Sequence, residues 1–276
     1  MLVYEGPLTD AGTVDIVSAI VSQDRAKSIT SSYGVCEAGT PPAVIAAENT
    51  LLQEAAAQGQ SFFASSGDSG AETCSQLGTG DYALSVEDPA AQPFATGVGG
   101  TSLTATGPPP TEGVWNDGPN PACGCTTAAV GGGSGGGLSD QWQMPSYQSG
   151  AAPSLGVINS NSAGGPCGGL CREVPDVSAD ADLLTGYVTE TDGSWGVEAG
   201  TSASSPLWAG YMALVNASSA CRGLSIGFAN PALYRIAGSS YPSNFHDITG
   251  ANPFFDKTSN DTLDQFGVGT SDPSFL

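Results

Sequence analysis

One serine stands in a context that could make it a nucleophile. Ser202 lies in the segment Gly200-Thr201-Ser202-Ala203, and an apolar stretch at residues 207–215 follows. A turn of small residues there would place the hydroxyl in the first turn of a helix, where free backbone N–H groups and the helix dipole stabilise an oxyanion. The simpler interpretation is that Ser202 or Ser204 only caps a core helix, with Pro206 in its first turn.

Histidine, the usual general base for a catalytic serine, does not precede Ser202 in this sequence. The sequence holds a single histidine, His246, and it follows Ser202. A carboxylate is the other candidate base. Its reference pKa of about 4.3, against about 6.5 for imidazole, leaves it a useful proton acceptor in acid, where imidazole would be charged.

Eight segments, in this order, resemble the sedolisin family of serine-carboxyl peptidases, and the resemblance covers nearly the whole chain. They are residues 29–37, 64–70, 97–103, 132–139, 145–148, 172–179, 200–206 and 245–249. The resemblance implies a subtilisin-like fold and a Ser-Glu-Asp triad in which glutamate does the work of histidine. A histidine-based subtilisin does not fit, because its triad order is Asp, His, Ser and no histidine precedes Ser202.

The resemblance gives two further segments a role beside Ser202. Asp68, in Ser66-Gly67-Asp68-Ser69-Gly70, matches the family's oxyanion-hole aspartate, which donates a hydrogen bond only when protonated. As an alternative, this segment is an ordinary turn whose aspartate makes an Asx-type bond. Ser134, Gly135 and Gly136 match an extended strand beside the cleft, where missing side chains let a peptide backbone pair. The alternative for residues 131–137 is a flexible hinge.

The sequence departs from the family where the base should be. The family pattern calls for a helix with Glu and, four residues later, Asp on one face. No glutamate of this sequence is followed four residues later by an aspartate. We therefore expect residues 1–276 to form a single peptidase catalytic domain that lacks the N-terminal part bearing this helix.

The alternation of apolar, β-branched runs with helical patterns predicts an α/β fold with a mostly parallel central sheet. The family resemblance implies that this fold is subtilisin-like, with helices on both faces. Expected strands cover residues 2–4, 28–32, 61–64, 94–97 and 176–179, and expected helices cover residues 14–23, 42–58, 202–216 and 231–236. The candidate site residues follow strand ends, where open α/β sheets bind ligands.

Charge and composition restrict the partners. The chain has 27 acidic and 6 basic residues, a net charge of −21, which disfavours nucleic acid and anionic membranes. No stretch could span a membrane. We expect a secreted, monomeric protein that acts on protein or peptide substrates and is suited to acid, although no secretory signal is visible at Met1.

Seven cysteines indicate an oxidising compartment. Cys36 and Cys74 follow two strands that should be neighbours, so we expect them to pair. The two close pairs, Cys123 with Cys125 and Cys167 with Cys171, are expected to bridge to each other, which leaves Cys221 over. A zinc site made of those four thiolates is the alternative, and acid conditions would weaken it.

Near the C-terminal end, the sequence resembles the family's calcium loop. The candidate oxygen ligands for calcium are Asp247, Ile248, Asn260, Thr262 and Asp264, with backbone carbonyls among them. The glycines that usually precede the second aspartate are replaced here, so a polar loop without metal is the alternative.

Taken with the family resemblance, the sequence predicts an acid-acting serine endopeptidase or, alternatively, an inactive fragment that at most binds peptides.

Overall fold

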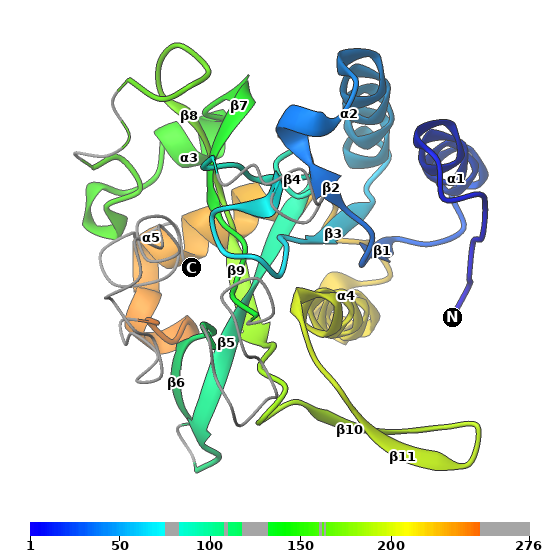
Figure 1. Cartoon of the computed structure of the whole chain (residues 1–276), viewed down its shortest axis with the longest axis vertical. Coiled ribbons are helices and arrows are strands. Elements are labelled where there is room, and N and C mark those ends of the chain that lie inside the picture. The colour runs from blue at the N-terminus through cyan, green and yellow to red at the C-terminus, as the bar shows by residue number, and fades with distance from the viewer. Residues whose placement is uncertain (75–82, 108–109, 118–131, 160–161, 163, 249–276) are drawn as a thin grey trace.

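The computed structural model describes residues 1–74, 83–107, 110–117, 132–159, 162 and 164–248 (Figure 1). Its central sheet joins β1 (Ser28–Ser31), β3 (Ser61–Ser65), β5 (Thr96–Ala105) and β9 (Val177–Asp180) in parallel. Strand β6 (Thr111–Val114) is antiparallel to β5. The expectation of a mostly parallel α/β sheet is confirmed.

The other elements surround this sheet. They are α1 (Asp10–Gln23), β2 (Val35–Cys36), η1 (Glu37–Gly39), α2 (Pro42–Ala57), β4 (Glu87–Asp88), β7 (Gly137–Gln143), α3 (Ser146–Ser149), η3 (Pro153–Leu155), β8 (Cys171–Val174), β10 (Tyr187–Thr191), β11 (Ser194–Glu198), α4 (Thr201–Ala217), η4 (Ser219–Cys221) and α5 (Asn230–Asn244).

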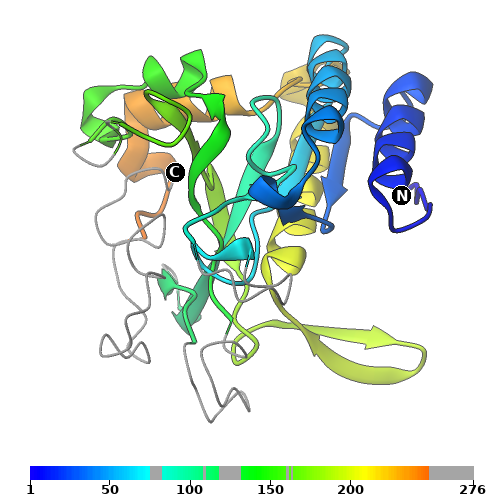
Figure 2. The same ribbon diagram turned by 45° about the horizontal axis from the view of Figure 1, so that its top comes forward.

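Helices cover both faces of the sheet, and the side chains of β3 alternate between two cores (Figures 1 and 2). Phe62 and Ala64 pack in a cluster with residues of α1 and α2. Phe63 packs on the opposite face with residues of α4 and α5. All five residues of β3 are buried, as expected of a strand covered on both sides. The layer order places the start of α4 beside the end of β3.

The first helix starts earlier than the sequence pattern indicates. We expected it at residue 14, but α1 begins at Asp10 because the Thr9 side chain caps it and accepts a hydrogen bond from the Gly12 N–H at 3.1 Å. Gly12 is required there, since a Cβ would lie 2.1 Å from the Pro7 carbonyl oxygen. The last expected helix is also longer, because α5 continues past residue 236 through a kink at Ser240.

The expected strand at residues 2–4 is wrong. This segment pairs with no strand of the described residues, and Leu2 and Val3 are exposed. Its contacts are with α1 instead: the Tyr4 hydroxyl donates a hydrogen bond to Gln23 at 3.0 Å. An apolar segment forms a strand only where a neighbouring backbone can pair with its N–H and C=O groups. Here the segment contacts helix α1 and not a strand.

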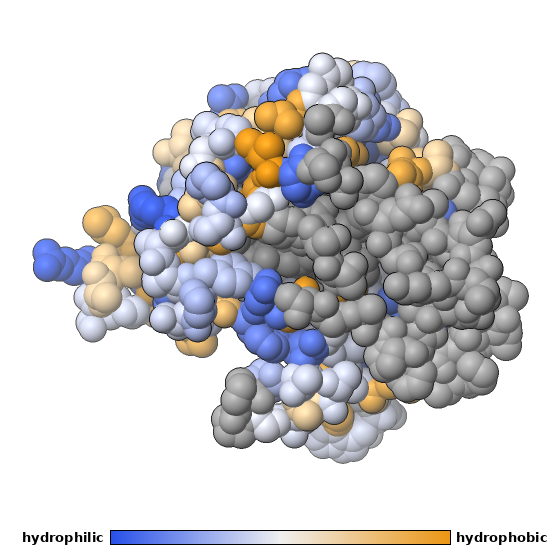
Figure 3. Space-filling model, turned by 90° about the vertical axis from the view of Figure 1, so that its left-hand side faces the viewer, coloured by the Kyte–Doolittle hydropathy of each residue, from blue (hydrophilic) through white to orange (hydrophobic). Residues whose placement is uncertain are grey.

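The β10–β11 hairpin was not expected from the sequence. It projects away from the rest of the protein (Figures 1 and 2) and carries Val188, Trp195 and Val197 as exposed residues. On the face seen in Figure 3, by contrast, the described hydrophobic residues form small groups among polar ones. No helix within the described ranges is long and apolar enough to cross a membrane.

Two disulfides lie in the described part of the chain. Cys36 pairs with Cys74, as expected, and ties β2 to the turn after β3. Cys167 pairs with Cys171, which corrects the expectation of bridges to Cys123 and Cys125 and also removes the proposed four-thiolate zinc site. Cys123 and Cys125 lie outside the described residues. Cys221 is free and half-buried.

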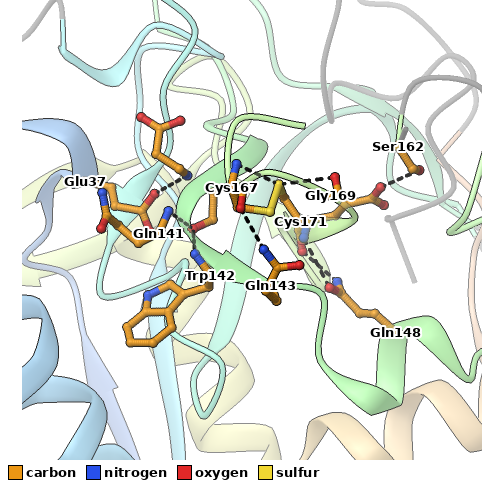
Figure 4. The surroundings of a disulfide bond; sticks show 12 residues. Glu37, Gln141, Trp142, Gln143, Gln148, Ser162, Cys167, Gly169 and Cys171 are labelled. Carbon is orange, nitrogen blue, oxygen red and sulfur yellow. Dashed lines mark hydrogen bonds between the residues drawn. A yellow bond between two sulfur atoms is a disulfide. The ribbon is translucent and has the colours of Figure 1, made fainter. Parts of the chain in front are cut away.

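The pairing of Cys167 with Cys171 follows from the local geometry, which brings their Cα atoms to 5.7 Å across a glycine-containing loop. Figure 4 shows this loop beside β7, where the Gln143 side chain donates to the Cys167 carbonyl oxygen at 2.7 Å. On the other side, Gln148 accepts from the Glu173 N–H and donates to the Glu173 carbonyl oxygen. The loop is therefore held between β7 and β8.

Candidate active site

Ser202 is the second residue of α4, and its own backbone is supported from β1. Pro206 has no N–H, so it cannot donate the helical hydrogen bond to the Ser202 carbonyl oxygen four residues earlier. The hydroxyl of Ser32, just after β1, takes that place and donates to this oxygen at 2.7 Å. Within the described part of the chain, no group hydrogen-bonds the Ser202 hydroxyl, which leaves it available for reaction.

The helix start is not capped by its own serines. The residue before the helix is Gly200, at φ +84°, and it has no side chain to accept from the first turn. Ser204 is buried and donates to the carbonyl oxygens of Ala179 and Asp180. The interpretation of Ser202 or Ser204 as a simple helix cap is therefore wrong.

Asp68 performs the capping instead, from the turn that follows β3. One carboxylate oxygen, Oδ1, accepts from the Thr201 N–H and from the Thr201 hydroxyl, both at 2.8 Å. The other oxygen, Oδ2, lies so close to Gly200 that a Cβ there would be 2.6 Å away. These contacts cross from the turn after β3 to α4 and are not the local Asx-type turn that was the alternative. They bring Asp68 to the residue that precedes Ser202.

The glycine-rich segment packs along the Asp68 turn. Gly133 donates its N–H to the Asp68 carbonyl oxygen at 3.0 Å, and Gly135 donates to the Gly67 carbonyl oxygen at 2.8 Å. A Cβ on Gly135 would lie 2.0 Å from the Ser66 carbonyl oxygen, so only glycine fits. The described part of this segment is thus held by backbone bonds and is not a free hinge.

The three residues expected to bind substrate occupy different surroundings. Ser134 is fully buried, and its hydroxyl accepts from the Gly100 N–H at 2.8 Å. Gly135 lies against the Asp68 turn. Gly136 borders a cavity of about 220 Å³ beside that turn. Backbone pairing of this segment with a peptide stays a prediction.

Two buried carboxyl groups near the site escaped sequence reasoning. Burial, together with the carboxyl groups of Asp68 and Asp88, raises the pKa of Glu87 to about 8. The side chain of Glu87 lies against Gly34 and Gly67, since a Cβ on Gly34 would be 2.6 Å from the Glu87 Cδ. The only signal in the sequence is the pair of glycines that leaves room for it.

The second buried carboxyl is Glu37. Its pKa is raised to about 7 by burial, although it accepts hydrogen bonds from the Ser139 hydroxyl and the Asp140 N–H, both at 2.7 Å. These two bonds join η1 to β7. Both Glu37 and Glu87 are therefore neutral in acid.

Only part of the expected calcium loop lies within the described residues. Asp247 accepts a hydrogen bond from the Tyr241 hydroxyl at 3.1 Å, and burial together with Asp247 raises the pKa of Tyr241. The Ile248 side chain is buried against Val114. Asn260, Thr262 and Asp264 lie outside the described residues, so calcium stays a prediction. The single histidine, His246, pairs with Glu112 at 2.8 Å and not with the serine.

A serine at the start of a helix that packs against a parallel sheet, with an aspartate from the turn after a neighbouring strand bound to the first residue of that helix, is consistent with a subtilisin-like serine peptidase. The model of the subtilase family matches residues 3–220, and the chain belongs to that family.

Within the subtilases, the chain is similar to the serine-carboxyl peptidases. It is 39% identical over 253 residues to kumamolisin from Bacillus sp. (strain MN-32) and 34% identical over 259 residues to sedolisin from Pseudomonas sp. (strain 101). Each match covers 91% of this chain, but only 41% and 40% of the two relatives. Human tripeptidyl-peptidase 1 is 33% identical over 218 residues, which is 76% of this chain and 34% of that protein.

One solved structure agrees with this placement. The structure of Pseudomonas sedolisin, a serine-carboxyl proteinase complexed with pseudo-iodotyrostatin, superposes with a TM-score of 0.74 at 31% identity. The match covers 91% of this chain and 63% of the sedolisin chain. The sequence resemblance to the sedolisin family is thereby confirmed. The chain spans about two fifths of the length of kumamolisin and sedolisin. Its own activity is therefore stated as a proposal.

Proposed function

We propose that this chain is the nucleophile-bearing part of an acid-acting serine-carboxyl endopeptidase, secreted and supported by calcium. The observation that carries the proposal is the contact of Asp68 with Thr201, which joins a carboxyl group to the backbone beside Ser202. Two of the three elements that acyl transfer needs, a nucleophile and an oxyanion donor, then lie at one helix N-terminus.

The reaction would proceed by attack of the Ser202 Oγ on the carbonyl carbon of a peptide bond. The hydroxyl proton passes to a carboxylate base, and the carbonyl oxygen becomes an oxyanion. The Ser202 N–H and the protonated Oδ2 of Asp68 would donate to that oxyanion, while Oδ1 of Asp68 stays bound to Thr201. The amine leaves with a proton, and water then hydrolyses the acyl-enzyme.

The base must come from polypeptide that the described residues do not include, because no carboxylate among them hydrogen-bonds Ser202. The outer face of α4 supports this view. Leu207, Tyr211 and Leu214 follow a helical spacing and are 50%, 56% and 73% exposed, which leaves a hydrophobic stripe uncovered. The outer edge of β1 beside it pairs with no described strand.

The test compares this chain with a longer form that adds the in-frame residues encoded upstream of Met1. Both are assayed on acid-unfolded protein at about pH 4, where carboxylate bases still accept protons. We expect the longer form to cleave and its Ser202→Ala variant to be inactive. Mass spectra of the products distinguish internal cleavage from the release of tripeptides.

Two outcomes would contradict the proposal. Cleavage that survives the Ser202→Ala change would assign the chemistry to another residue. If no longer form cleaves, yet the chain binds unfolded peptides, the alternative holds, and the protein is a non-catalytic peptide-binding relative.

A further inference from the structure

The cavity of about 220 Å³ lies directly beside the proposed active site. Gly136 and Gly137 on one wall continue from Gly135, whose N–H binds the Gly67 carbonyl oxygen next to Asp68. On the other wall stands Ala71, in the turn that follows Asp68. The lining residues are Ala71, Leu84, Ser85, Gly136, Gly137, Leu138, Asp140 and Pro166.

Most of the cavity wall is hydrocarbon. Ala71, Leu84, Leu138 and Pro166 present apolar atoms, and Gly136 and Gly137 contribute no side chain to the wall. Ser85 is buried, and its hydroxyl already accepts from the Cys74 N–H at 3.0 Å. Such a wall favours the methylene stem of a long side chain.

Asp140 is the one charged residue of the lining. Its main chain is fixed, because its N–H donates to Glu37 at 2.7 Å. Its carboxylate, however, makes no hydrogen bond or ion pair with any residue in the described ranges. Partial burial raises the pKa of Asp140, so the carboxylate is incompletely hydrated. A cation at this place would supply the missing partner.

We propose that this cavity binds the side chain of a lysine or arginine residue of a peptide substrate, with Asp140 pairing with its cationic end. The inference rests on the proposed function, because it takes the bound side chain to belong to a peptide substrate. The binding itself does not require Ser202. The net charge of −21 at pH 7 adds long-range attraction for basic peptides.

Binding of a basic side chain should strengthen as the pH rises through the acid range. Asp140 attracts a cation only after it loses its proton, and the bound cation in turn favours that loss. Glu37, the carboxyl group that faces the Asp140 backbone from η1, ionises at higher pH, since its pKa is about 7. It therefore adds to the attraction only toward neutral pH.

The experiment uses the Ser202→Ala chain, so that binding is measured without cleavage. Two peptides serve as probes: acetyl-Ala-Ala-Lys-amide and acetyl-Ala-Ala-norleucine-amide, which share the hydrocarbon stem and differ in the charge. Amide NMR titrations at about pH 6 should show about fivefold tighter binding of the lysine peptide, with shifts at Leu138 and Ala71.

Three variants separate the charge from the fold. Asp140→Asn should remove the lysine preference and leave norleucine binding unchanged, whereas Asp140→Glu should keep part of the preference. Asp192→Asn, which removes an exposed charge at the tip of the β10–β11 hairpin, should change nothing. Circular dichroism confirms that each variant is folded.

Equal affinity for the two peptides, an unchanged preference in Asp140→Asn, or no binding of either peptide at millimolar concentration would each overturn the inference. None of these results depends on peptide-bond cleavage. A negative result in this binding test therefore does not contradict the proposed function. A negative cleavage assay likewise does not contradict the binding of basic side chains in the cavity.

Discussion

Replacing Glu87 by glutamine should flatten the dependence of this protein's stability on pH. In the folded chain, burial and the nearby carboxyl groups of Asp68 and Asp88 raise the pKa of Glu87 from 4.5 to about 8. The unfolded chain releases the same proton near 4.5. Above that pH the folded state holds a proton that the unfolded state has lost, so a rise in pH favours unfolding. The stabilisation is complete below about pH 4.5 and is lost as the pH approaches about 8.

The size of the effect follows from the two pKa values. The interval from 4.5 to about 8, at about 1.4 kcal/mol per pH unit, corresponds to a loss of about 5 kcal/mol. Solvent screens little of it, because Glu87 is only 5% exposed. Glu37, whose pKa rises to about 7, contributes a smaller loss of the same sign. The wild-type protein should therefore be far more stable in acid than above neutral pH.

The assay is urea unfolding, with disulfides intact, at several values between about pH 4 and pH 8. Glutamine has nearly the shape of protonated glutamic acid and cannot ionise, so Glu87→Gln should match the wild type near pH 4 and exceed it at pH 8. Glu190→Gln, an exposed change on the β10–β11 hairpin, is the control and should follow the wild-type curve. Parallel curves for wild type and Glu87→Gln would refute the assignment of the pH dependence to this carboxyl.

Two further predictions concern the groups that position Ser202. Ser32→Ala leaves the Ser202 carbonyl oxygen without its donor, so it should cost about 1 kcal/mol in thermal unfolding and lower kcat in any form of the protein that cleaves peptides. An unchanged kcat would show that Ser32 is only a surface contact. Asp68→Asn keeps an acceptor for the Thr201 N–H and donates a hydrogen bond at every pH. The alkaline limb of its kcat/KM profile should therefore move upward, whereas an unmoved limb would exclude Asp68 as the proton-dependent oxyanion donor.

Local patterns were sufficient for the parallel sheet and for the helix that carries Ser202. Alternating apolar runs and helical periods predicted the mostly parallel sheet, which the structure confirms, and helices lie on either side of β3. The small-residue turn before an apolar stretch located Ser202 at the start of α4. The pairing of Cys36 with Cys74 followed from two neighbouring strand ends. Each of these features depends on a few residues close in the chain or on the order of parallel strands.

Contacts between segments far apart in the chain decided the other features of the site and of its surroundings. The bond from Ser32 to the Ser202 carbonyl oxygen joins residues 170 positions apart. The burial of Glu87 against Gly34 likewise depends on which segments meet in space, as does the Asp140 carboxylate, which pairs with no residue of the described ranges. Cys167 pairs within its own loop because β7 and β8 hold that loop closed.

The sequence by itself therefore determined the layers of the fold and the start of the helix that carries Ser202, because periodicities and small-residue turns are local properties of the chain. Only the tertiary structure decided how that helix is capped, which carboxyl groups are buried, and which carboxylate meets no partner among the described residues. A pKa and an unpaired charge depend on burial and on neighbours from distant segments, and no local pattern of residues records those neighbours.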